Sequence, residues 1–139
     1  MLRKSYILIL MLLFSSCISK TKDYKKIEVW EKILKAVKEE NINYLLKISS
    51  DSLQCLACNN GKDWVKKETF FKDNFDQMKL GENKKYSYFK ENINDVNNEF
   101  KQRIRITYEN KYKGNKYDII YTILQNNNTI KFQGVFSIP

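Results

Sequence analysis

Histidine is absent from this 139-residue chain, and proline and glycine are scarce, with one and four residues. The lack of histidine excludes Ser-His-Asp and Cys-His nucleophile systems, imidazole zinc sites and c-type haem attachment. The shortage of proline and glycine, beside 42% apolar and 14% aromatic residues, excludes a collagenous, linker-rich or disordered chain. The composition therefore predicts a single packed globular domain.

Long apolar runs are also missing, apart from a short one near the N-terminus. The segment Tyr6–Phe14 is apolar, follows the basic pair Arg3 and Lys4, and gives way to a polar, basic segment at residues 19–26. A membrane-spanning helix needs about 20 apolar residues, so this run is too short and is typical of a cleaved secretory signal. We therefore expect the chain to be exported.

The end of this leader, Phe14-Ser15-Ser16-Cys17, resembles the lipobox of bacterial lipoproteins, with Phe14 in place of the usual leucine. The resemblance implies that Cys17 receives diacylglycerol and that the chain is cleaved before it. Several acyl chains would then hold the protein firmly to its membrane. The alternative is an ordinary signal peptide that ends near an incidental cysteine.

The same resemblance divides the chain into a signal peptide (1–16), an acylated cysteine with a polar tether (17–25) and one folded domain (26–139). Ile18 does not match the acidic signal that retains some lipoproteins in the inner membrane, so we expect the outer membrane in a Gram-negative envelope. The tether and the residue after it carry lysines that either contact anionic headgroups or are simply solvated: Lys20, Lys22, Lys25 and Lys26.

The first half of the mature chain has helical periodicity. An amphipathic helix is predicted over residues 25–39, and a shorter one follows Asn41, ended by the polar run at residues 49–52. A third helix is predicted from a cap at Asp63 to Gly81. Its apolar positions form one stripe: Trp64, Phe71, Phe75 and Met78.

The second half alternates, as β-strands do. Residues 86–93 are a weak strand candidate, residues 100–108 predict a strand with one wet face, and residues 117–124 predict a central strand. A last strand with alternating apolar residues follows a turn at residues 126–128. Three helices followed by an antiparallel meander of about four strands predict an α+β fold with the helices on one sheet face. This element order resembles the nuclear-transport-factor-like cone fold, in which a curved sheet wraps a helix.

Cys55 and Cys58 have the two-residue spacing used by disulfides, redox sites and metal sites. Asn59 stands where haem attachment needs histidine, and two thiolates supply only half of a tetrahedral metal shell, so no cofactor is expected. We expect a disulfide between them in an oxidising compartment, with redox activity as the alternative.

Positive charge is in excess, with 25 Lys and Arg against 16 Asp and Glu. The lysines are dispersed among acidic residues, which argues against nucleic acid as a partner. Arg103 and Arg105 project from one strand face, where they either clamp an anion or form cross-strand ion pairs.

Two classes of function remain open. The favoured one is a non-enzymatic domain, anchored in the envelope by its lipid, that binds a partner protein or a small apolar or anionic ligand. The alternative is a cone-fold enzyme of isomerase or dehydratase type with a carboxylate and tyrosine site, for which Asp118 and Tyr121 are candidates. A carboxylate deep in an apolar cavity beside a tyrosine would favour the enzyme.

Overall fold

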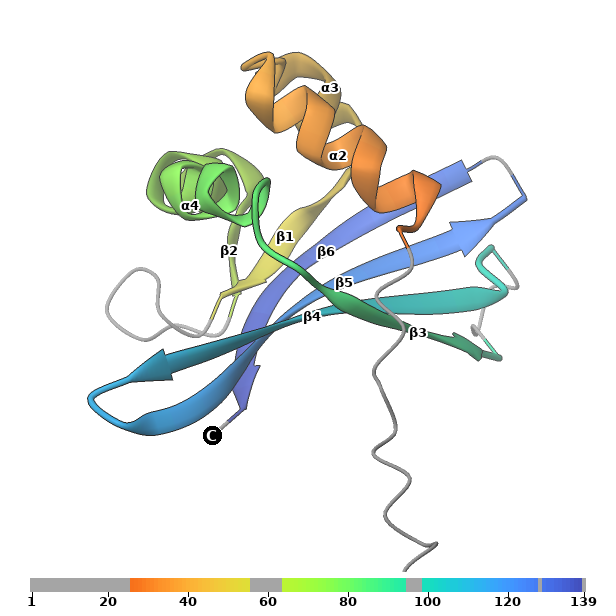
Figure 1. The fold of residues 1–139 in the computed structure, drawn as a ribbon. Helices are drawn as coiled ribbons and strands as arrows, with labels where there is room; N and C mark the ends of the chain where they lie inside the picture. Colours follow the sequence, from red (N-terminus) through yellow and green to blue (C-terminus); the bar gives the residue numbers. More distant parts are fainter. Residues whose placement is uncertain (1–25, 56–63, 95–98, 128, 139) are drawn as a thin grey trace, which may run out of the picture.

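The computed structural model describes residues 26–55, 64–94, 99–127 and 129–138. Within these residues, three helices lie on one face of a six-stranded sheet (Figure 1): α2 (Glu28–Lys38), α3 (Ile42–Lys47) and α4 (Lys67–Gly81). The prediction of an α+β fold is confirmed. The strands are β1 (Ser49–Cys55), β2 (Trp64–Lys66), β3 (Ser87–Asn92), β4 (Gln102–Tyr112), β5 (Asn115–Asn126) and β6 (Thr129–Ile138).

The sheet has the order β2-β1-β6-β5-β4-β3 and is mixed. Strands β3 to β6 form the predicted antiparallel meander, but β1 runs parallel to β6 and pairs antiparallel with β2 on its other side. The expectation of an antiparallel meander of about four strands is therefore only roughly right, because β1 and β2 extend the sheet beyond the meander. The long connection from β2 through α4 to β3 carries the chain from one edge of the sheet to the other.

Both additional strands lie where the sequence predicts other structure. The polar run Ser49–Ser52 is predicted to break a helix, yet it begins β1, and the nearby Ile48 carbonyl accepts a hydrogen bond from the Phe132 amide of β6. Trp64 is predicted to lie in the third helix but belongs to β2, and that helix begins only at Lys67. The expected cap, Asp63, lies outside the described residues.

Helix α2 behaves as its periodicity predicts. One stripe is buried against the sheet, and Glu28 pairs with Lys32 on the solvent side. Asn41 caps α3, because its Oδ1 accepts a hydrogen bond from the Tyr44 amide. The buried residues of α2 are Val29, Trp30, Ile33, Leu34, Ala36 and Val37.

Strand β6 changes face part of the way along. Its register with β5 shifts between the Ile123–Phe132 and Thr122–Gly134 pairs, and Gly134 has a φ of 115°. Phe132 and Val135 are therefore both buried although they are three residues apart. The sequence predicts an uninterrupted alternation that this bulge breaks.

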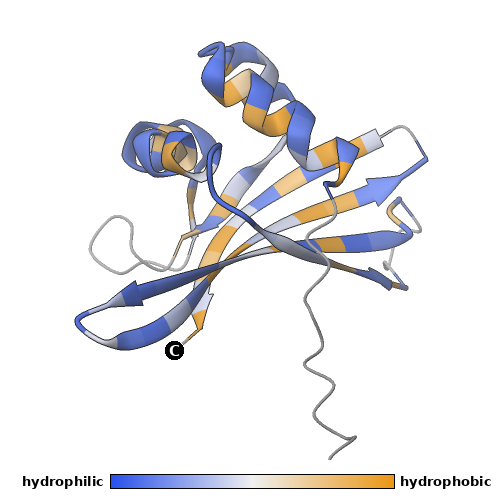
Figure 2. Cartoon of the chain, viewed as in Figure 1, coloured by the Kyte–Doolittle hydropathy of each residue, from blue (hydrophilic) through white to orange (hydrophobic). Residues whose placement is uncertain are grey.

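The core lies between the helices and the sheet and is strongly aromatic. The Trp30 indole donates a 2.7 Å hydrogen bond from Nε1 to the Tyr108 hydroxyl, and its ring lies 4.9 Å from that of Tyr121. Phe132 stacks between Tyr121 and Phe71. Hydrophobic residues concentrate along the centre of the sheet, whereas the tip of the β4–β5 hairpin is hydrophilic (Figure 2).

Candidate anion-binding cleft

A cleft of about 720 Å³ lies at the end of the molecule where α2 begins, and it is larger than the two other hollows described below. The start of α2, the end of α3, strand β3 and the β5–β6 hairpin line it together. Four of its lining residues are lysines and one is a glutamate, so the lining carries a surplus of three positive charges. The lysines are Lys26, Lys32, Lys47 and Lys90.

The four lysines differ in their partners. Lys26 Nζ lies 3.3 Å from Glu31 Oε2, and Lys32 Nζ lies 2.7 Å from Glu28 Oε1. The hydrogen bond from Lys32 lowers the pKa of Glu28, and the same contact raises the pKa of Lys32, so both groups are charged at neutral pH. Within the described residues, Lys47 and Lys90 form no ion pair, so their charge is available to a ligand.

Neutral donors complete the lining. Tyr44 and Tyr88 reach it from α3 and β3, and Gln125, Asn127 and Thr129 reach it from the hairpin. Hydroxyl and amide groups donate hydrogen bonds to oxyanions as lysine does. The cleft thus offers several donors of both kinds to an anion.

The start of α2 is fixed to the sheet by a polar contact with Tyr86, which immediately precedes β3. The Tyr86 hydroxyl accepts a hydrogen bond from the Ile27 amide at 3.0 Å and donates one to Glu31 Oε1 at 2.7 Å. Burial raises the pKa of Tyr86, so its hydroxyl remains a donor at neutral pH. This contact holds one wall of the cleft, α2, in place against the strand that supplies Lys90.

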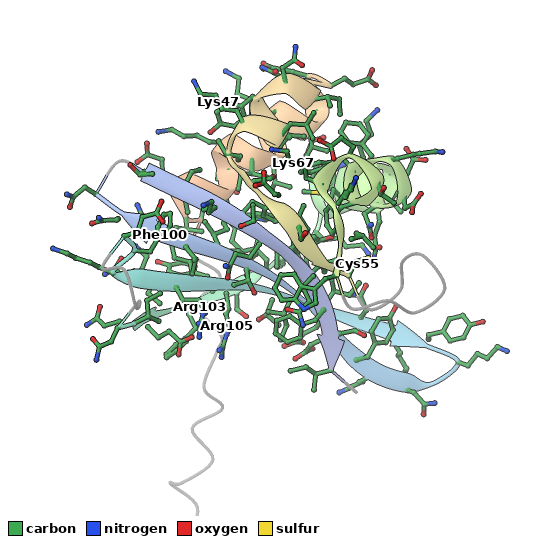
Figure 3. All side chains as sticks on the ribbon, turned by 180° about the vertical axis from the view of Figure 1, so that it is seen from behind. Lys47, Cys55, Lys67, Phe100, Arg103 and Arg105 are labelled. Carbon is green, nitrogen blue, oxygen red and sulfur yellow. The ribbon has the colours of Figure 1, made fainter. Side chains whose placement is uncertain are left out.

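Arg103 and Arg105 lie elsewhere, on the face of the sheet away from the helices (Figure 3). Both guanidinium groups contact the same oxygen of Glu91 on β3, at 3.1 and 3.0 Å. The sequence leaves two roles open for this pair, an anion clamp and a cross-strand ion pair, and the structure shows the ion pair. An anion would have to displace Glu91 before it could bind there.

The cysteine predictions fall largely outside the described residues, because Cys17 and Cys58 are among those that the structure does not describe. Cys55 is completely buried on β1, and its Sγ lies 3.5 Å from Nδ2 of Asn74, which also donates to the Phe70 carbonyl. Lipidation of Cys17 and a disulfide between Cys55 and Cys58 stay predictions.

The candidate acid–base pair is not formed. Asp118 and Tyr121 are three residues apart on β5, so their side chains point to opposite faces of the sheet. Tyr121 lines a small pocket of about 200 Å³ with Tyr108 and Tyr117, and no carboxylate is among that pocket's described lining residues. Burial raises the pKa of Tyr121, which disfavours a tyrosinate base.

A third hollow, of about 510 Å³, lies between α3 and α4. Its floor is apolar, formed by Ile42, Leu46, Phe71 and Phe75, and its rim carries charges of both signs. Nothing in its lining selects a particular ligand.

Comparison with protein-family models, curated proteins and solved structures gives no match. Of the described helices, none has the length and apolar character needed to cross a membrane. The described residues also contain no cluster of three or more potential metal ligands.

Sequence reasoning did not find the cleft. Lys47 and Lys90 are 43 positions apart in the sequence, within a dispersed set of lysines, and only the folded structure shows that both line one cleft. In the sequence, these lysines are visible only as part of the overall excess of positive charge.

Proposed function

We propose that this protein is a lipid-anchored domain of the bacterial cell envelope that binds an anionic ligand without transforming it. The cleft at the start of α2 carries the proposal, because four lysines and one glutamate line a cavity of about 720 Å³. That volume is in the range of small-molecule sites, which hold several hundred cubic ångströms. The placement of the helices on one face of a curved sheet supports the resemblance to cone folds, which place their sites between sheet and helices.

The lipid anchor is the second part of the proposal. A short apolar leader that ends in Ser15-Ser16-Cys17 supports acylation of Cys17 and retention at the membrane. Metabolic labelling with a fatty acid analogue should mark the wild-type protein, and Cys17→Ser should be unlabelled and released from the membrane fraction. An unlabelled wild-type protein would remove the anchor from the proposal and leave the cleft untouched.

The cleft itself is tested with inorganic pyrophosphate as an anionic probe in calorimetric titrations. The double variant Lys47→Gln, Lys90→Gln removes the two lysines that form no ion pair within the described residues. A matched control, Lys111→Gln, Lys116→Gln, removes the same charge from the exposed β4–β5 hairpin. At about 1.5 kcal/mol for a hydrogen bond to a charged group, the cleft variant should lose at least about tenfold in affinity. Equal losses in the two double variants would indicate diffuse attraction and refute the site.

A further inference from the structure

The cleft lies at the point where the tether enters the folded domain. Lys26 is the first described residue, and its side chain lines the cleft. It lies nine positions after Cys17 in the sequence. A fully extended chain spans at most about 3.6 Å per residue, so the tether cannot exceed about 32 Å. An acyl anchor on Cys17 therefore keeps this end of the domain close to the bilayer surface.

The chemistry of the cleft matches that surface. Phospholipid headgroups present phosphate oxygens, for which Lys47 and Lys90 supply positive charge and Gln125 and Thr129 supply neutral donors. Tyr44 and Tyr88 add side chains with an apolar ring and a polar hydroxyl, the combination favoured at membrane interfaces.

We propose that the cleft docks on anionic phospholipid headgroups of the membrane that carries the anchor. The inference rests on the proposed function and names its ligand class. Individual contacts can be weak, because the tether holds the cleft at a high effective concentration next to the headgroups. Docking would orient the domain, with the start of α2 and the β5–β6 hairpin towards the bilayer and the β4–β5 hairpin away from it (Figure 1).

Chemical acetylation of lysine side chains, measured by peptide mass spectrometry, tests this orientation. The experiment uses the mature protein with its acyl anchor on Cys17. The protein is placed in vesicles of phosphatidylcholine alone or of phosphatidylcholine mixed with phosphatidylglycerol. Each lysine at an anionic surface contributes about 1 kcal/mol, which is about fivefold in an equilibrium constant. The acetylation rates of Lys47 and Lys90 should therefore fall at least about fivefold in the anionic vesicles. Lys111 and Lys116 are internal controls whose rates should change less than about twofold.

The outcomes separate the two proposals. Equal protection of all four lysines, or of none, would overturn headgroup docking. A further arm adds soluble glycerol phosphate to the protein in phosphatidylcholine vesicles. Protection of Lys47 and Lys90 by glycerol phosphate, without protection by anionic vesicles, would assign the cleft to a soluble anion and leave the proposed function standing. Intact mass reports acylation of Cys17 independently of either result.

Discussion

Gly134 is the position where we expect one added methyl group to disturb the fold most. Its φ of 115° is a conformation that side chains rarely adopt, and a Cβ at this position would lie 2.2 Å from the backbone oxygen of Gln54 on β1. The backbone nitrogen of Gln54 would lie at 2.5 Å. Backbone atoms cannot rotate away as a flexible side chain can, so Gly134→Ala should separate β1 from β6 at this point.

The magnitude follows from two contributions. A non-glycine residue at positive φ costs about 1–2 kcal/mol. Separating the Gln54–Gly134 and Cys55–Val135 pairs removes ladder hydrogen bonds worth about 1 kcal/mol each. We therefore expect a loss of about 3–4 kcal/mol in the free energy of unfolding, a large part of the roughly 5–15 kcal/mol of a typical domain. At roughly 4 °C per kcal/mol, the midpoint of thermal unfolding should fall by about 12–16 °C.

Urea unfolding followed by tryptophan fluorescence measures this loss, because Trp30 is buried in the core. Gly114→Ala is the matched control: Gly114 also has a positive φ, of 87°, but nothing lies within 4 Å of the position that an added Cβ would occupy. The control should lose only the conformational cost of about 1–2 kcal/mol. Equal losses in the two variants would refute the assigned role of the close approach to β1.

Three further predictions concern the helices and the aromatic core. Trp30→Phe keeps an aromatic ring but removes the hydrogen bond to the Tyr108 hydroxyl, so calorimetry should show a loss of about 1–2 kcal/mol, and no loss would contradict the bond. Burial raises the pKa of Tyr108 to about 12, above the ordinary value of 10.0, so the folded state keeps its proton where the unfolded state has lost it. Stability should therefore decline as the pH rises from about 10 to about 12, and Tyr108→Phe should make urea midpoints less dependent on pH in that range. Asn41→Ala removes the cap that accepts from the Tyr44 amide and should cost about 1 kcal/mol in urea titrations, whereas Asn41→Asp should retain most of the stability.

The elements that the sequence predicted well have their apolar residues at the spacing of a single structure type. Residues 25–39 place apolar side chains at helical spacing over about three turns, and α2 occupies Glu28–Lys38. Residues 100–108 alternate, and β4 buries Ile104, Ile106 and Tyr108. In both cases the local pattern and the tertiary packing favour the same structure.

Strand β1 could not be predicted in this way because its N-terminal half is polar. The run Ser49–Ser52 favours a turn in isolation. Its strand conformation depends on partners far away in the sequence, Phe132 and Gly134 on β6 and Val65 and Lys66 on β2. Tertiary pairing overrides local preference here, as it often does for strands.

The arginine pair shows why a local sequence pattern did not identify the candidate anion-binding cleft. The spacing of Arg103 and Arg105 correctly places both on one face of β4, but it carries no information about the neighbouring strand. Glu91 lies opposite Arg103 on β3, and one of its oxygens contacts both guanidinium groups. Within a sheet, a cross-strand carboxylate is held close to its partners, so the ion pair forms at a smaller entropic cost than binding of a free anion.

Positive charge alone does not distinguish the cleft from the rest of the surface. The tip of the β4–β5 hairpin also carries exposed lysines: Lys111, Lys113 and Lys116. At this tip Lys111 lies directly opposite Lys116, but a hairpin tip is convex, so solvent surrounds the exposed ammonium groups. In the cleft, the lysines come from separate segments and line one cavity together with residues that carry amide and hydroxyl groups. An anion bound there would exchange part of its water for several donors at once, and weaker screening would strengthen each contact. Concavity therefore distinguishes this candidate site from the hairpin tip. The place of Lys26 in its lining, nine positions after Cys17, is the reason for proposing the membrane surface as its ligand.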